Sequence, residues 1–141
     1  MGLIGDEDAQ EIRERLSEMT NPVRLIHFTQ ELGLEYGREA KQLMEELAGL
    51  SDKLSVEVLN FQLDQERVAE YGIDKVPATV LRNGKDHGIR FYGIPAGHEF
   101  ATVLDTILAL SQGDSGLKPE SREKLAAVTT PLHLEVFVTP T

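Results

Sequence analysis

The side chains best suited to proton transfer lie in two adjacent pairs, His98-Glu99 and Asp86-His87. A histidine beside a carboxylate can act as an acid–base pair. His98-Glu99 follows Gly97 at an expected helix start, however, so helix capping and a favourable first-turn charge explain it more simply. Asp86-His87 lies at an expected hairpin and has no metal-ligand spacing. No Ser-His-Asp order, phosphate-binding loop or dinucleotide fingerprint occurs, so no catalytic constellation is predicted.

The amino-acid composition excludes further kinds of partner and of catalysis. The chain has 141 residues, enough for one domain and a fragment, with 24 acidic against 14 basic residues and a net charge of −10. This balance disfavours nucleic acid and anionic membranes as partners, because both are bound through clustered cations. There is no cysteine, which excludes thiolate catalysis and dithiol exchange within this polypeptide. We therefore predict no metal site and no cofactor.

The first half of the chain predicts alternating helices and strands, from helical apolar stripes and strand-length apolar runs. His27 falls in the first strand, where a core histidine with a satisfied hydrogen bond is expected. The predicted elements in chain order are helix Asp6–Met19, strand Val23–Phe28, a helix ending near Leu50, strand Leu54–Phe61 and helix Gln65–Tyr71.

The second half predicts a hairpin followed by a long helix. Strand Ala78–Arg82 leads into Asn83-Gly84, a strong hairpin-turn dipeptide, and strand Gly88–Tyr92 returns antiparallel. An apolar stripe then predicts a helix from about His98 to Ser111. The fold class is therefore α/β, a mixed sheet of about four strands flanked by helices.

The last part of the chain repeats the first. Residues 119–128 predict a helix with proline in its first turn, and Leu132–Val138 predicts a strand. A shift of 109 positions places Pro22 on Pro131, with a helix before and a strand after each.

We accordingly expect one unit over residues 1–111, a linker over 112–118, and over 119–141 the first helix and strand of a truncated second unit. A lone apolar strand recruits other chains. We expect Leu132–Val138 either to pair with a neighbouring molecule, which would give a homo-oligomer, or to dock on the first unit.

Five segments carry a resemblance to known proteins: Asn21–Phe28, Leu50–Ser55, Val76-Pro77-Ala78, Arg90–Phe100 and Val136–Thr141. In these segments the chain resembles the glutaredoxin-like protein disulfide oxidoreductases, which contain two tandem thioredoxin-fold units. It is also similar, at several of these positions, to the N-terminal region of the flavoprotein component of alkyl hydroperoxide reductase. The resemblance covers the whole chain and implies a thioredoxin fold.

The chain departs from that family where the chemistry would be. The family can carry Cys-x-x-Cys at the start of its second helix, but Leu34-Glu35-Tyr36-Gly37 stands there. Leu34 and Gly37 are thus vestigial dithiol positions, and the resemblance implies a redox-inactive unit. The family's second dithiol follows the Val-Phe-Val-Thr-Pro-Thr segment, and this chain ends at Thr141, so we expect it to stop short of the catalytic part.

The resemblance also implies a binding site for client protein or peptide. In the thioredoxin fold the proline before the third strand is cis, and the preceding residue offers backbone groups to an extended peptide. These residues are Pro77 and Val76 here. Leu34, Tyr36 and Ile94 are expected to line the same groove, with ordinary packing at a helix start as the alternative.

Two functions follow as expectations. The first is a redox-inactive N-terminal unit of a thiol-disulfide oxidoreductase, which supports a catalytic second unit and binds client peptide. The second is a docking or substrate-binding module for a flavoprotein or peroxide-reducing partner. The N-terminus has no signal-peptide pattern and no apolar run reaches the length of a membrane span, so a soluble, cytoplasmic protein is expected.

Overall fold

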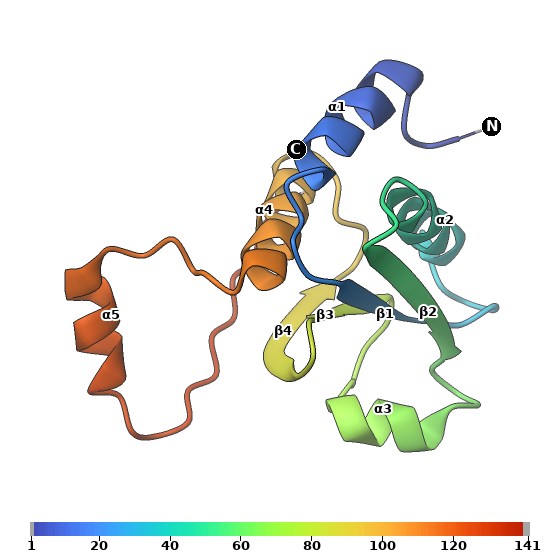
Figure 1. Ribbon diagram of the computed structural model, residues 1–141. Coiled ribbons are helices and arrows are strands. Elements are labelled where there is room, and N and C mark those ends of the chain that lie inside the picture. The colour runs from blue at the N-terminus through green and yellow to red at the C-terminus, as the bar shows by residue number, and fades with distance from the viewer. Residues whose placement is uncertain (1, 140–141) are drawn as a thin grey trace.

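The computed structural model describes residues 2–139. Its elements alternate in the predicted order through the first unit (Figure 1). They are α1 (Asp6–Leu16), β1 (Val23–Thr29), α2 (Gly37–Ala48), β2 (Leu54–Asn60), α3 (Gln65–Tyr71), β3 (Ala78–Arg82), β4 (Asp86–Tyr92), α4 (His98–Gln112) and α5 (Pro119–Ala126).

The four strands form one mixed sheet in the order β2-β1-β3-β4. β1 and β2 are parallel, whereas β3 is antiparallel to both of its neighbours. Helices α1, α2 and α4 lie on one face of the sheet and α3 lies on the other (Figure 1). This arrangement confirms the predicted α/β thioredoxin fold.

The sheet separates two apolar clusters, and β1 contributes to both. Leu25 packs into the larger cluster beneath α1, α2 and α4, whereas Ile26 and Phe28 pack into the smaller cluster beneath α3. The Phe28 ring meets the edge of the Tyr71 ring at 5.9 Å between centroids. Burial on both faces explains why apolar residues occupy both parities of this strand.

Several predicted boundaries differ from the structure by one to three residues, and two of these differences have a clear local cause. α1 ends at Leu16 rather than Met19, because the chain turns there through a Met19 N–H to Leu16 C=O hydrogen bond of 3.0 Å. β4 begins at Asp86 rather than Gly88, since Asp86 still pairs with Arg82 across the hairpin. Met19 remains buried, so the apolar stripe was correct although the helix ends earlier.

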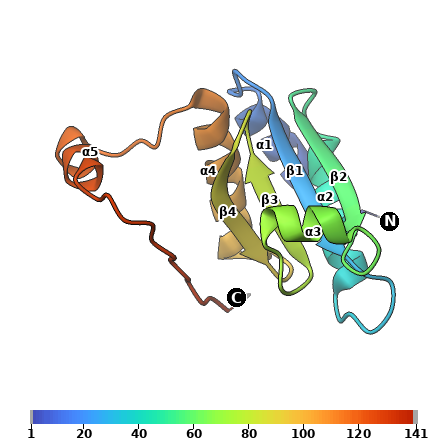
Figure 2. The ribbon, with the colours of Figure 1, turned by 90° about the horizontal axis from the view of Figure 1, so that it is seen from below.

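The C-terminal part differs most from expectation. α5 forms but has no buried residue, and it lies away from the sheet (Figure 2). Residues 131–139 contain no strand, and Leu134, Val136 and Phe137 are 84–90% exposed. The expectation that this segment docks on the first unit is therefore wrong for this chain. A strand needs a neighbour for its backbone groups, and none of the described residues provides one.

Within residues 2–139, no helix combines the length and the apolar character that crossing a membrane requires.

Candidate functional site

Loops attached to all four strands meet at one end of the sheet, at the lower edge of Figure 2. Phe28 in β1 lies opposite Ala78 in β3, so the segment after β1 lies beside the segment before β3. β1 and β2 end together, with Thr29 opposite Asn60, and β4 ends with Tyr92 opposite Ala78. We call this the loop end of the sheet. It collects residues 30–36, 61–64, 72–77 and 93–97.

Leu34 and Gly37, the positions at which the resemblance places the family's dithiol, lie in direct contact at this end. Gly37 is the first residue of α2 and is buried. A Cβ atom placed on Gly37 would lie 3.2 Å from the Cβ of Leu34 and only 2.6 Å from its Cδ2. The Leu34 side chain thus fills the space that a side chain at position 37 would need. An apolar contact therefore joins these two positions.

Tyr36, between these two positions, has a left-handed backbone conformation with φ of 58°. Its side chain is 57% exposed. A residue with a Cβ atom is disfavoured in this region, and such conformations concentrate at functional sites. The geometry therefore presents an aromatic ring to solvent at the loop end, at a cost in backbone energy.

Replacement of Tyr36 by glycine is expected to stabilise the fold by about 0.5–1 kcal/mol, because relief of the left-handed conformation outweighs the added chain entropy of glycine. Urea unfolding would measure the change. Tyr36→Ala is the matched control, since it removes the ring but keeps the Cβ atom. Equal stabilities of the two variants would contradict this account of the strain.

Val76 and Pro77 connect α3 to β3 through the expected cis peptide bond. Pro77 is buried, and its carbonyl oxygen accepts a hydrogen bond of 2.8 Å from the Gly93 N–H. Within residues 2–139, neither the N–H nor the C=O of Val76 makes a hydrogen bond to the rest of the chain. These two groups are available to an extended peptide that adds as a strand.

Val76 and Ile94 share the loop end but pack on opposite faces of the sheet. The half-buried side chain of Val76 joins the cluster under α3, whereas that of Ile94 joins the cluster under α4. The hydrogen bond between Gly93 and Pro77 brings the Ile94 backbone next to the cis peptide. The predicted groove residues are thus neighbours through their backbones rather than through their side chains.

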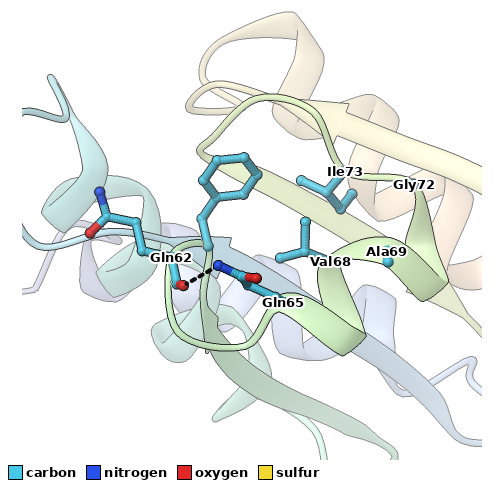
Figure 3. A pocket seen from close by; sticks show the side chains of 7 residues that line it. Gln62, Gln65, Val68, Ala69, Gly72 and Ile73 are labelled. Atoms are coloured by element: carbon cyan, nitrogen blue, oxygen red, sulfur yellow. Dashed lines mark hydrogen bonds between the residues drawn. The ribbon is translucent and has the colours of Figure 1, made fainter.

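An open groove of about 520 Å³ lies beside α3 (Figure 3). In the figure the side chains of Val68 and Ile73 approach the same space, and Gln65 Nε2 donates to the Gln62 carbonyl at 3.3 Å. The groove is lined by Phe61, Gln62, Gln65, Val68, Ala69, Gly72 and Ile73.

This groove and the cis-proline loop share an apolar base, because Phe61, Val68 and Val76 pack against the same apolar cluster. The sequence pattern does not predict this groove, because it extends the strand through Phe61. β2 ends one residue earlier, at Asn60. The available signal was an aromatic residue immediately before a polar turn and an amphipathic helix.

His27 lies buried in the middle of β1, on the face that carries Leu25 and α2. Its Nδ1 lies 2.9 Å from the Thr79 hydroxyl oxygen, but its Nε2 has no partner among the described residues. The expected satisfied hydrogen bond is therefore present at only one ring nitrogen. Burial, with a smaller effect of Lys41, lowers the pKa of His27 to about 4, so the ring is neutral at pH 7.

Neither of the two His-carboxylate pairs forms an acid–base pair. Asp86 binds Arg90, which lowers the pKa of Asp86 to about 2, while His87 Nε2 lies 2.9 Å from Asn83 Oδ1. The expected side-chain capping by His98-Glu99 is wrong, because the N-cap of α4 is Gly97, but Glu99 does lie in the first turn of the helix as expected. In the described part of the chain, no three His, Asp or Glu side chains are placed to hold a metal ion.

No family model matches the chain. The alkyl hydroperoxide reductase protein AhpF of Staphylococcus epidermidis is 29% identical over 118 residues, which make up 82% of this chain and 21% of that protein. A solved protein disulfide oxidoreductase from Aeropyrum pernix superposes with a TM-score of 0.88 and 28% identity, over 97% of this chain and 60% of that one. The NTD_N/C domain of alkylhydroperoxide reductase AhpF from Enterococcus faecalis superposes with a TM-score of 0.79 and 24% identity, over 89% of this chain and 61% of that one.

This chain therefore spans about a fifth of the staphylococcal AhpF and three fifths of the Aeropyrum protein. The fold and both sequence relationships agree with the resemblance found in the sequence. The chain is a thioredoxin-fold homologue of the N-terminal region of alkyl hydroperoxide reductase AhpF and of a protein disulfide oxidoreductase.

Proposed function

We propose that this chain is the redox-inactive unit of a thiol-disulfide oxidoreductase, and that it binds extended client polypeptide at the loop end of its sheet. One observation carries the proposal. The dithiol positions are closed by the contact of Leu34 with Gly37, while the backbone of Val76, at the same end of the sheet, is unpaired within the described chain. The unit would thus keep the means to bind a peptide and lack the means to exchange its disulfides.

Two features of the loop end would each contribute to peptide binding. The N–H and C=O of Val76 would pair with the peptide backbone, which gives affinity without sequence preference. The groove bounded by Phe61, Val68 and Ile73 would accept one apolar side chain. Burying such a side chain contributes about 1.5–3 kcal/mol, so apolar segments of unfolded clients are the preferred ligands.

Phe61→Ala is expected to weaken client binding about tenfold, which corresponds to the loss of roughly 1.4 kcal/mol of apolar contact. Reduced and S-alkylated insulin B chain is a suitable probe, because it is extended and its blocked thiols cannot exchange. Fluorescence anisotropy of the labelled peptide measures the affinity, and thermal melting verifies that each variant is folded.

Leu63→Ala is the matched control for this experiment. Leu63 lies two residues away in the same loop and is 81% exposed, so its removal should leave binding unchanged. Phe61→Leu should restore most of the affinity. Equal affinities of the wild type and Phe61→Ala would refute the role of the groove.

A second candidate function is a docking module for a flavoprotein or peroxide-reducing partner. The observation that favours it is the match to alkyl hydroperoxide reductase AhpF, which covers 82% of this chain. The coding sequence around this chain separates the two candidates. A Cys-x-x-Cys thioredoxin-fold unit beside it supports the first, and a flavin-binding domain supports the second.

We further propose that residues 119–139 belong with a second thioredoxin-fold unit, joined to the first by residues 112–118, and that the protein works in the cytoplasm. The superposition on the Aeropyrum protein covers 97% of this chain and thus includes α5, and it supports this division. The exposed Leu134, Val136 and Phe137 would then be covered by that unit.

A further inference from the structure

The turn that joins β3 to β4 contains Asn83 and Gly84, the only Asn-Gly dipeptide in the sequence. It lies at the end of the sheet opposite to the loop end (Figure 2). Asparagine is a thermolabile residue. It is most labile before glycine, because the next main-chain nitrogen can attack the side-chain amide and glycine has no Cβ atom to shield that nitrogen. The contacts of this turn therefore bear on a chemical reaction as well as on the fold.

The side-chain oxygen of Asn83 accepts two hydrogen bonds. The Lys85 N–H donates to Asn83 Oδ1 over 3.2 Å, and His87 Nε2 lies 2.9 Å from the same oxygen. Because an amide oxygen can only accept, His87 Nε2 carries the hydrogen of this contact. Attack on the amide carbon would place negative charge on Oδ1, and two donors already converge there, as in an oxyanion hole.

The nitrogen that would attack is unengaged and accessible. Within residues 2–139 the Gly84 N–H makes no hydrogen bond. Gly84 is exposed, and a Cβ atom placed on it would have no neighbour within 4 Å. The hydrogen bond from Lys85 to Asn83 Oδ1 spans two residues, so it folds the side-chain amide back along the Gly84 peptide. The two groups that must combine are thus held in one turn.

The nitrogen that would leave is the one that ties the hairpin to α4. Asn83 Nδ2 donates to the Leu110 carbonyl oxygen over 3.3 Å. Leu110 lies in the last turn of α4, which ends at Gln112. Carbonyl groups at a helix C-terminus carry partial negative charge. Loss of Nδ2 would therefore replace a donor by an acceptor opposite this carbonyl.

We propose that Asn83 is a self-modification site, at which the chain converts this asparagine to aspartate or isoaspartate with His87 as the catalytic donor. The Gly84 nitrogen gives its proton to water and bonds to Asn83 Cγ, while the π electrons of the carbonyl move to Oδ1. As these electrons return, the Cγ–Nδ2 bond breaks, and Nδ2 takes a proton from water and leaves as ammonia. Water then adds to a carbonyl of the resulting succinimide and opens the ring. No oxidant or reductant takes part.

The modification would release the hairpin from α4, because a carboxylate cannot donate to the Leu110 carbonyl. Asn83→Asp reproduces the aspartate product and should lower Tm by about 3–6 °C. The site lies away from the loop end, so the inference does not depend on the proposed peptide site. An unchanged Tm in Asn83→Asp would contradict this consequence.

The test is an incubation of the full chain at neutral pH, well below its Tm, with mass spectrometry of proteolytic peptides. We expect Asn83 to convert before Asn21 and Asn60, because proline and phenylalanine follow these two residues. His87→Ala should slow the conversion about fivefold, the effect of one exposed hydrogen bond. In urea the wild type and His87→Ala should react at equal rates, since the contact is lost with the fold.

Gly84→Ala is the matched variant for the nucleophile. Its Cβ atom has free space, so the fold should persist while the added methyl group slows the attack. Thermal melting before incubation verifies that His87→Ala and Gly84→Ala are folded. Equal rates of conversion in the folded wild type and folded His87→Ala would overturn the role of His87. Conversion of Asn60 before Asn83 would overturn the assignment of the site.

Discussion

Cysteines placed at positions 34 and 37 are expected to form an intramolecular disulfide and to give this chain thiol-disulfide exchange activity. The Cβ atom of Leu34 and a Cβ atom built on Gly37 are 3.2 Å apart, close to the roughly 3.5–4.5 Å that disulfides need. Replacing Leu34 also removes the Cδ2 atom that would clash with a side chain at 37. The thiols would lie at the start of α2, where a helix N-terminus lowers a thiol pKa.

The double variant Leu34→Cys/Gly37→Cys should therefore show two free thiols when reduced and none after mild oxidation, while remaining monomeric. Its insulin-reduction rate should rise from background to a measurable value. Leu34→Ser/Gly37→Ser is the matched control, since it has nearly the same shape without sulfur. Oxidation that yields only intermolecular dimers would show that these positions are not the dithiol positions of the fold.

Acidification from pH 7 to pH 4 is expected to cost about 3 kcal/mol of unfolding free energy through His27 alone. Burial lowers the His27 pKa from 6.5 to about 4 in the folded chain, so between these values the unfolded chain binds more protons than the folded one. Stability is therefore full above pH 6.5 and falls as the pH decreases toward 4. Asp86, with a pKa lowered to about 2, loses its contribution only below about pH 4.

Urea unfolding at a series of pH values measures this loss. In His27→Gln the corresponding part of the pH dependence should disappear, although its stability at pH 7 will be lower because a buried contact to Thr79 changes. The decisive quantity is the difference between pH 7 and pH 4 within each protein. If wild type and His27→Gln lose the same free energy over this range, His27 is not the buried neutral group described here.

The elements of the first unit could be predicted because each has a local cause. α3 and β3 begin and end at the predicted residues, since an apolar pattern and a turn residue bound each of them. The Asn83-Gly84 dipeptide predicted the hairpin turn. Apolar residues on both faces of β1 indicated a strand that is covered on both sides. The dithiol positions Leu34 and Gly37 could be placed only through the resemblance, because their chemistry is absent.

The remaining features depend on long-range contacts, which a local pattern does not contain. The strand predicted over Leu132–Val138 needs a neighbour that the first unit does not offer. The groove beside Phe61 arises from the packing of α3 against the sheet. Arg24 and Arg82 lie opposite each other because of the register of β1 and β3. The Nε2 of His27 lacks a partner among the described residues because of the side chains that bury it.

The central claim is that a unit without a dithiol keeps a peptide site at the loop end of its sheet. Titration of the ¹⁵N-labelled chain with S-alkylated insulin B chain tests this most directly. We expect saturable amide shifts concentrated at Leu34–Gly37, at Val76 and Ala78, and at Gly93 and Ile94, with the Val76 amide shifting most. Shifts confined to other surfaces, or a Val76 amide that stays unchanged at saturation, would contradict the claim.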